Sequence, residues 1–431
     1  MRNQVCYFTL DDPEPWSLDN YLKHGGYSAW KKILAGEMSG DEVLDTLKSA
    51  GLRGRGGAGF PTGVKWSFMP RGTGGQNYMV CNSDESEPGT CKDRDILRFN
   101  PHAVIEGMAI GGFATDSTVA YNYLRGEFGD EPFQRIEQAR QEAYDAGLLG
   151  KNIQGSGIDF DYHNAIGAGA YICGEETALL ESLEGNKGQP RFKPPFPAAY
   201  GLYGRPTTIN NTESYASVGI ILRKGAEWFS SMGVENAGGM KIFSVSGHVE
   251  SPGNFEIPLG TPFSQLLELA GGVWKGRALK AVIPGGSSTP VLPAEVMNDL
   301  TMDYDAIAKA GSMLGSGAVV VMDESVCMVT MLRRISRFYF AESCGQCTPC
   351  REGTGWLYRV LDRIVAGGGR PEDIELLDRV AGNIAGKTIC ALGDAAAMPV
   401  QGMLRHFRHE FEYFIEHKRS MVNGAAESAA A

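Results

Sequence analysis

The sequence predicts an α/β protein whose last quarter is a bundle of helices. Between residues 78 and 183, helical patterns alternate with short apolar runs of strand type, an order typical of a parallel sheet. From residue 326 on, the chain instead carries four apolar stripes at three-to-four spacing, which predict helices that pack together. With 431 residues, 43% of them hydrophobic, the chain is long enough for two to four domains.

Composition and charge exclude several classes of function. The net charge is −11 and no basic stripe follows any segment, which disfavours nucleic-acid binding. Residues 1–16 carry acidic side chains and lack an apolar core, so they do not form a secretory signal. No apolar run approaches the roughly 18 to 20 residues that span a bilayer. We therefore expect a soluble protein of a reducing compartment, which meets a membrane only through partners.

The first 50 residues predict an irregular lead-in followed by helices, and a glycine-rich loop follows at residues 54–63. Gly54, Gly56 and Gly59 satisfy the dinucleotide pattern G-x-G-x-x-G, but a helical pattern precedes the loop where the usual fingerprint has a strand. The match alone is weak. Residues without Cβ nevertheless let a ligand approach the backbone, and exposed N–H groups suit a pyrophosphate.

The next segment, residues 78–81, predicts a buried strand that ends in a polar, acidic loop at residues 82–89. Open α/β sheets bind ligands at the carboxyl ends of their strands, so this loop is a candidate site. A solvated acidic turn is the alternative. Further strands are predicted at residues 117–123 and 159–164, and an amphipathic helix at residues 131–147.

A second glycine-rich turn begins at Gly167 and leads through Glu175 and Glu176 into a predicted helix at residues 177–183. Acids in a first helical turn often only complement the helix dipole, so that alternative stays open. Residues 191–212 form a turn-rich piece in which Asn210 and Asn211 precede a helical stretch. These amides suit helix capping and anion binding equally well.

From residue 241 the pattern predicts a small α+β module of about 80 residues. Residues 241–249 alternate as a strand, and residues 251–254 form a turn. Thr261 and Pro262 open a short helix, and residues 280–283 form another strand.

Three cysteines at a strict three-residue spacing, Cys344, Cys347 and Cys350, are followed by Cys390 after 39 intervening residues. This pattern suits a 4Fe-4S cluster, because the tight trio wraps three corners and a remote thiolate binds the fourth. A four-cysteine zinc site is the alternative, although zinc modules usually use two separated pairs. The trio lies between the first two predicted C-terminal helices and Cys390 between the last two. One end of a bundle could thus close all four thiols around one cluster.

Four motifs follow one another along the chain: the glycine loop, the Tyr-Ile-Cys-Gly-Glu-Glu-Thr turn at residues 171–177, the Asn-Asn-Thr-Glu run at residues 210–213 and the cysteine quartet. Taken together in this order, they resemble one family. It is the NADH-binding, flavin-carrying subunit of bacterial respiratory complex I, and the resemblance covers about residues 15–420. The resemblance implies a Rossmann-like FMN- and NADH-binding domain at residues 1–238 and a ubiquitin-like β-grasp domain at residues 239–320. It also implies a four-helix bundle with the 4Fe-4S site at residues 321–422, and we expect a mobile tail at residues 423–431.

The resemblance also implies the site residues. For FMN they are Gly54, Gly56, Gly57, Lys65, Asn82, Asp84, Tyr171, Gly174, Glu175, Asn210, Asn211 and Thr212. For NADH they are the loop from Gly54 to Gly63, the candidate adenine-stacking rings Phe60, Phe68 and Phe196, and the polar contacts Glu87, Glu176 and Lys193. The cofactor site further includes Arg55, Gly59, Glu85 and Gly167, and the cluster ligands are Cys344, Cys347, Cys350 and Cys390.

The family's reaction implies hydride transfer from NADH to FMN and then single electrons to the cluster, so we assign no general acid or base. The implied partners are a thioredoxin-like 2Fe-2S subunit and a large multi-cluster iron-sulfur subunit, with quinone as the final acceptor. The implied location is the cytoplasmic side of the inner membrane. The nearest alternative is the diaphorase subunit of a soluble NAD-linked hydrogenase or formate dehydrogenase, and a more distant one is a zinc-stabilised scaffold without redox activity.

Overall fold

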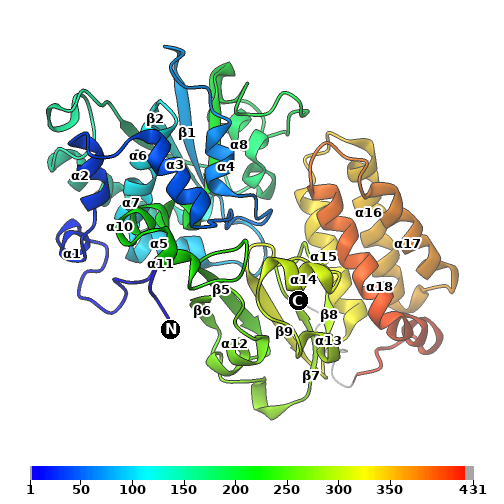
Figure 1. The fold of residues 1–431 in the computed structure, drawn as a ribbon. Coiled ribbons are helices and arrows are strands. Elements are labelled where there is room, and N and C mark those ends of the chain that lie inside the picture. The colour runs from blue at the N-terminus through cyan, green and yellow to red at the C-terminus, as the bar shows by residue number, and fades with distance from the viewer. Residues whose placement is uncertain (1, 423–431) are drawn as a thin grey trace. The chain divides into compact units, whose positions relative to one another are not determined.

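The computed structural model describes residues 2–422, which form two compact units. Unit 1 comprises the chain up to Ser86 together with Thr90–Phe243 and Asn254–Gly260. Unit 2 comprises Glu87–Gly89, Ser244–Gly253 and the chain from Thr261 on. Each unit is described separately below, and the tail predicted at residues 423–431 lies outside the described residues (Figure 1).

Unit 1 contains a four-stranded, fully parallel sheet with the order β3-β2-β1-β4. Its strands are β1 (Asn77–Ser83), β2 (Ser117–Leu124), β3 (Asp161–Ile166) and β4 (Thr207–Asn211). The predicted parallel α/β core is confirmed, and three of its strands lie within two residues of their predicted positions. The prediction for residues 191–212 was incomplete, because this turn-rich piece contains β4. Its residues are mostly polar, and pairing with β1 buries four of the five.

Helices surround this sheet. They are α1 (Leu18–Lys23), α2 (Ser28–Leu34), α3 (Gly40–Ser49), α4 (Thr62–Ser67), α5 (Lys92–Phe99), α6 (Pro101–Ala114), α7 (Glu131–Asp145), α8 (Glu176–Leu183), α9 (Thr212–Ala216), α10 (Val218–Lys224) and α11 (Ala226–Ser230). Helix α6 packs against β1 and β2 and is buried along almost its whole length, so it forms the centre of the core. A Cβ on Gly107 would lie only 2.0 Å from the carbonyl oxygen of Tyr215, so a glycine is needed where α6 passes α9.

A second sheet has the order β6-β5-β9-β7-β8. Its strands are β5 (Met240–Gly247), β6 (Gly253–Pro258), β7 (Leu279–Ile283), β8 (Leu292–Pro293) and β9 (Ala318–Asp323). Strand β5 pairs with β9 in parallel, while β7 is antiparallel to β8 and β9. The accompanying helices are α12 (Phe263–Leu269), α13 (Ala294–Met297) and α14 (Tyr304–Lys309). The boundary expected at residue 320 falls inside β9, which continues to Asp323.

Four helices end unit 2 and lie side by side (Figure 1). They are α15 (Met328–Glu342), α16 (Thr348–Arg363), α17 (Glu372–Ile384) and α18 (Leu392–His417). Helices α15 and α17 each pack against both α16 and α18. The predicted apolar stripes lie inside these helices, except Val326, which precedes α15, and Ile364, which directly follows α16. Across residues 2–422, no helix combines the length and apolar character needed to cross a membrane.

Candidate functional site

The carboxyl ends of β1 and β4 bring four predicted site residues together. Asn82 and Asn211 are register partners across the two strands. The Asn82 amide donates to the carbonyl oxygen of Gly174 at 2.8 Å, which draws the second glycine turn to the strand end. Thr212 exchanges a 2.7 Å hydrogen bond with Ser83 at the end of β1. Polar side chains thus converge at the edge where a parallel sheet binds ligands.

The glycine loop closes beside the end of β4. The backbone N–H of Gly54 donates to the Phe60 carbonyl oxygen at 2.8 Å, which closes the loop on itself. A Cβ on Gly56 would lie 3.0 Å from the Cβ of Asn211, so this glycine packs on the end of β4. A Cβ on Gly57, where φ is +147°, would meet no atom within 4 Å. The loop therefore exposes backbone to open space beside the polar strand ends, as the cradle for a phosphate-bearing cofactor requires.

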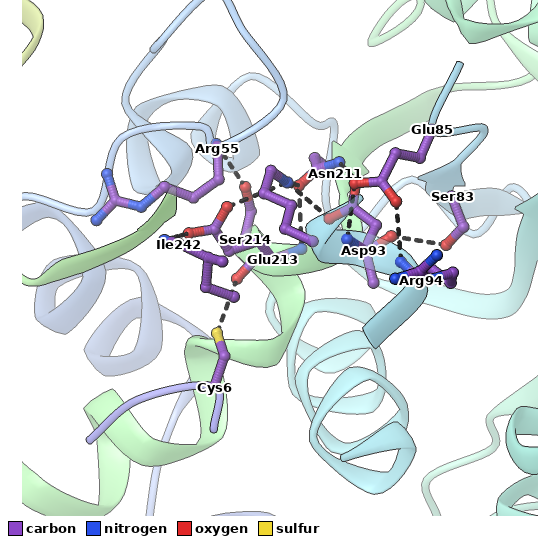
Figure 2. Close-up of polar contacts among 12 residues, drawn as sticks. Cys6, Arg55, Ser83, Glu85, Asp93, Arg94, Asn211, Glu213, Ser214 and Ile242 are labelled. Carbon is purple, nitrogen blue, oxygen red and sulfur yellow. Dashed lines mark hydrogen bonds and ion pairs between the residues drawn. The ribbon is translucent and has the colours of Figure 1, made fainter. Parts of the chain in front are cut away.

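The side chain of Arg55 in this loop points into the protein interior. Its side chain is fully buried, and its guanidinium donates to the carbonyl oxygen of Gly238 at 2.8 Å. Its backbone N–H donates to the Ser214 hydroxyl at 2.9 Å. The guanidinium thus anchors the loop to the core, and Figure 2 shows it directed away from Asn211 and Asp93.

Two lysines and two glutamates form a charged group at the start of α8. Lys65 donates to Glu176 at 3.1 Å and to the Ile209 carbonyl oxygen at 2.7 Å. Lys193 donates to Glu175 at 2.9 Å and to Glu176 at 3.0 Å. Burial alone raises the pKa of Glu176, but Lys65 and Lys193 lower it further than burial raises it, so the carboxylate is ionised. Glu175 also caps α8 by accepting from the backbone N–H groups of Thr177 and Ala178.

The two asparagines that precede α9 have distinct environments. The Asn210 side-chain oxygen accepts a 2.9 Å hydrogen bond from the indole N–H of the buried Trp66. The Asn211 side chain caps α9 by accepting from the Glu213 N–H at 3.0 Å. Of the two roles left open by the sequence, capping is therefore the one that the structure bears out for Asn211.

Two acids of the loop after β1 accept hydrogen bonds from backbone N–H groups. Glu85 is buried and accepts from the backbone N–H groups of Asp93 and Arg94 at 2.7 and 3.0 Å, at the beginning of α5. Burial and the neighbouring Asp93 raise the pKa of Glu85. Glu87 belongs to unit 2, where it accepts from the Ser288 N–H at 2.8 Å. Glu85 therefore holds the backbone of Asp93, whose own carboxylate accepts from the Asn211 amide at 2.7 Å.

The three candidate stacking rings are exposed. Phe60, Phe68 and Phe196 keep 47%, 60% and 59% of their surface accessible, so none is a core residue. The rings of Phe60 and Phe68 lie 6.2 Å apart, with an interplanar angle of 45°. Exposed aromatic faces of this kind suit stacking on a flat ligand such as adenine.

The remaining candidates line the turns around these strand ends. Tyr171 and Gly174 belong to one turn of 3-10 helix before α8, and a Cβ on Gly174 would lie 3.2 Å from the Asp84 carbonyl oxygen. A Cβ on Gly167 would lie 2.5 Å from the hydroxyl oxygen of Tyr123. Side chains would therefore displace their neighbours at both glycines.

A group of buried charges, which no sequence motif indicated, contacts the Asn211 side chain (Figure 2). Lys92, Asp93 and Glu213 are each at most 2% exposed, and Lys92 forms ion pairs with both acids. Lys241 also forms an ion pair with Glu213. In the sequence, these charges are marked only by the pair Lys92-Asp93 just after the acidic loop. This pair looks like an ordinary helix start, so it does not indicate burial.

The cysteine quartet lies at the helix ends of unit 2. Cys347 is the residue that precedes α16, Cys350 lies in the first turn of that helix, and Cys390 lies two residues before α18. The Ile389 N–H donates to the Cys347 sulfur at 3.3 Å, which joins the two helix starts. Burial raises the pKa of the Cys350 thiol, and the charges of Cys344 and Cys347 raise it further, so the trio lies close together.

This donor set fits a cuboidal cluster. Gly345 has a φ of +77°, which turns the chain between Cys344 and Cys347. Within residues 2–422, no group of three or more His, Cys, Asp or Glu side chains is placed to hold a single metal ion. In a 4Fe-4S cube each thiolate binds a different iron, so its ligands do not converge on one point. The starts of α16 and α18 also direct helix dipoles toward the thiolates, which favours their negative charge.

Models of known protein families match three separate regions of the chain. The model described as the Nuo51 FMN-binding domain matches residues 47–219, and the SLBB domain matches residues 242–292. The model described as the NADH-ubiquinone oxidoreductase-F iron-sulfur binding region matches residues 330–414. The first region contains the strand-end site, and the last contains all four cysteines.

Curated proteins named as the F subunit of NADH-quinone oxidoreductase are similar along almost the whole chain. The one in Rickettsia bellii is 56% identical over 417 residues, which are 96% of this chain and 99% of that protein. The one in Rickettsia typhi is 53% identical and covers 94% and 96% of the two chains, respectively. The one in Streptomyces coelicolor is 52% identical and covers 94% and 89%.

Among solved structures, the chain is similar to an NAD+-reducing NiFe hydrogenase. For its H2-reduced state the TM-score is 0.84 at 33% identity, and for its air-oxidised state it is 0.83 at 33% identity. The H2-reduced match covers 95% of this chain, which spans 66% of the length of the hydrogenase chain.

Proposed function

The chain belongs to the family of F subunits of NADH-quinone oxidoreductases, and from this premise we propose how its residues serve NADH oxidation. One observation carries the proposal. The polar ends of β1 and β4 fall inside the region matched by the FMN-binding family model, and the four cysteines fall inside the region matched by the iron-sulfur model. The proposed FMN site and the proposed cluster site therefore each lie in the region matched by the family model for that cofactor.

In unit 1, the glycine loop and the ends of β1 and β4 bind FMN, and the exposed rings of Phe60, Phe68 and Phe196 bind the adenine of NADH. Lys65 and Lys193 supply positive charge for phosphate groups, while Asn82 and Thr212 fix the strand ends. When bound, FMN accepts a hydride from NADH and supplies single electrons to a 4Fe-4S cluster. The residues present hold and orient the two planar groups, and none is required to move a proton.

In unit 2, Cys344, Cys347, Cys350 and Cys390 bind the 4Fe-4S cluster. The hydrogen bond from Ile389 to Cys347 sets the remote segment beside the trio before any cluster is present. Hydrogen bonds and helix dipoles around the sulfurs lower the cost of their negative charge and tune the reduction potential of the cluster.

The domain division is part of this proposal. A Rossmann-like domain ends near residue 238, a ubiquitin-like β-grasp domain contains the second sheet through β9, and a four-helix bundle comprises α15 to α18. The mixed sheet with α12 beside it and the matched SLBB region support the β-grasp domain. The mutual packing of the last four helices supports the bundle.

The proposed partners are a thioredoxin-like 2Fe-2S subunit and a large multi-cluster iron-sulfur subunit of the same complex, on the cytoplasmic side of the inner membrane. The second candidate function is the diaphorase subunit of an NAD-linked hydrogenase, which the likeness to the NAD+-reducing hydrogenase favours. The identity of 52–56% to the F subunits of NADH-quinone oxidoreductase, against 33% to the hydrogenase, favours the respiratory complex.

The test is cofactor analysis of the purified chain combined with NADH:ferricyanide activity. We expect bound FMN, iron and acid-labile sulfide together with NADH oxidation. A colourless chain that contains zinc and no iron would contradict the proposal. Co-purification of the tagged chain from its native host then separates the two complexes, because a hydrogenase subunit in the eluate would favour the second candidate.

A further inference from the structure

The strongest unexplained feature is the buried ion network of Lys92, Asp93, Glu213 and Lys241, which contacts the side chain of Asn211. Lys92 and Glu213 are 1% exposed and Lys241 is 0% exposed. A network of buried charges is costly to desolvate and is weak evidence for stability. A contribution to stability therefore does not by itself explain why these charges are buried together.

Lys92 uses its whole hydrogen-bonding capacity inside this network. Its ammonium lies 2.6 Å from Asp93, 3.0 Å from the Asn211 side-chain oxygen and 3.1 Å from Glu213. An ammonium has three N–H donors, so one is available for each contact. Burial lowers the pKa of Lys92, but Asp93 and Glu213 raise it by more, and the side chain remains a cation.

These contacts fix the orientation of the Asn211 amide. Its oxygen accepts from Lys92 and from the Glu213 N–H, both at 3.0 Å. Its nitrogen donates to Asp93 at 2.7 Å and to the Asn82 carbonyl oxygen at 3.4 Å. A cation on one side of the amide and a carboxylate on the other allow only one assignment of its oxygen and nitrogen.

Asn211 in turn joins three parts of the proposed FMN site. It ends β4, it caps α9, and its Cβ supports Gly56 of the glycine loop. A shift or flip of this amide would move the strand end and the loop together.

We propose that Lys92 is a positioning residue for FMN: together with Asp93 it locks the Asn211 amide and so sets the distance between the glycine loop and the ends of β1 and β4. This role deepens the proposed function and rests on FMN binding at these strand ends. Lys92 acts through Asn211 and does not itself need to touch the cofactor.

The test compares Lys92→Met with Lys241→Met in the full-length chain. Both lysines are buried and both form an ion pair with Glu213, so both variants leave that acid with one cation fewer. Lys92 donates to the Asn211 side-chain oxygen at 3.0 Å, whereas Lys241 donates to the Arg55 carbonyl oxygen of the glycine loop at 3.2 Å, so the pair compares the amide contact with a direct contact to the loop backbone. The Kd of FMN is measured on the flavin-free chain by quenching of flavin fluorescence, and the resistance of each variant to urea is measured in parallel.

We expect Lys92→Met to raise the Kd of FMN by about tenfold or more relative to Lys241→Met, with a similar loss of urea resistance in both. At saturating FMN, the KM for NADH stays near the wild-type value in both variants. An equal rise in the Kd of FMN would overturn the inference, because the contact of Lys92 with Asn211 would then matter no more than the contact of Lys241 with the loop backbone. A wild-type chain that fails to bind FMN refutes the proposed function instead.

If Lys92→Met does not fold, Asp93→Asn replaces it, because this change keeps the side-chain shape but removes the carboxylate that orients the Asn211 nitrogen. We expect a weaker but measurable rise in the Kd of FMN, at least about threefold over Lys241→Met. No difference between these two variants would equally overturn the inference.

Discussion

At the scale of single residues, Glu176 is held between two cations. Its carboxylate contacts Lys65 at 3.1 Å and Lys193 at 3.0 Å, and these lysines keep its pKa low despite burial. A fixed negative charge beside the adenosine of a bound dinucleotide repels a 2′-phosphate. Its removal would also leave two lysines able to bind that phosphate.

We therefore predict that Glu176→Gln raises kcat/KM for NADPH by about tenfold, the effect of removing one like charge near a partly buried phosphate. Steady-state assays with NADPH and NADH measure the change. The control is Glu181→Gln on the same helix, whose carboxylate pairs with Arg191. NADPH oxidation that stays at the wild-type rate in Glu176→Gln would refute this role.

Glu256 provides a residue-scale prediction for pH. It is buried and accepts from the backbone N–H groups of Val5, Cys6 and Tyr7, and burial raises its pKa to about 7. The folded state then binds this proton more tightly than the unfolded state does. Stability from this group is thus greatest at low pH and decreases as pH rises from about 4.5 to about 7, by roughly 3 kcal/mol in all.

We expect Glu256→Gln to flatten this part of the pH profile. The free energy of unfolding of the transition that includes unit 1 is measured by urea between pH 5 and pH 8, for the wild type and the variant. Identical slopes in the two proteins would show that Glu256 titrates at its ordinary value.

The site residues differ in how well the sequence predicts them. Asn82, Gly174 and Thr212 are brought together as the motifs imply, because strand ends and glycine turns are local features. The buried guanidinium of Arg55 and the engagement of Glu85 with α5 were not predictable from the motifs. Arg55 contacts Gly238, which is far away in the sequence, and Glu85 contacts the start of another element, α5. The residue type alone does not specify such contacts.

At the scale of elements, the starts of α16 and α18 lie next to Cys347, Cys350 and Cys390, three of the proposed cluster ligands. The spacing of the cysteine trio alone indicated a soft metal centre, and the helices around it followed from the apolar stripes. Strand β4 did not follow, because Thr207–Asn211 is polar and becomes a strand only by pairing with β1.

We predict that Cys390→Ala abolishes stable cluster binding, since the remote thiolate supplies the fourth corner of the cube. Iron and sulfide per chain fall well below half of the wild-type content. The matched control is Cys327→Ala, a buried cysteine just before α15 that is not part of the quartet. If the Cys390 variant keeps full iron content while the Cys327 variant loses it, the ligand assignment is wrong.

The close approach of α6 and α9 gives a second prediction at this scale. Gly107→Ala would place a methyl group 2.0 Å from the Tyr215 carbonyl oxygen, so we expect a loss of about 1–3 kcal/mol in unfolding free energy. Gly382→Ala in α17 is the control, because its Cβ meets nothing within 4 Å. That change should be neutral or stabilising by up to about 1 kcal/mol, and urea unfolding distinguishes the two.

At the scale of the whole molecule, the chain combines two chemistries in two compact units. The strand-end site belongs to unit 1, and the cysteine quartet belongs to unit 2. The sequence predicts both sites because each is marked by a local motif. It does not predict that residues 254–260 return to unit 1 after unit 2 has begun, because this return depends on contacts such as those of Glu256 with the N-terminal segment.

The proposed function requires that one chain accept electrons from NADH and transfer them to a cluster bound by Cys344, Cys347, Cys350 and Cys390. The most direct measurement is the electron paramagnetic resonance spectrum of the purified chain, loaded with FMN and its cluster, after anaerobic addition of NADH. We predict the signal of a reduced 4Fe-4S cluster in the wild type and the absence of this signal in Cys390→Ala. A wild-type cluster that stays oxidised with NADH but is reduced by dithionite would contradict it.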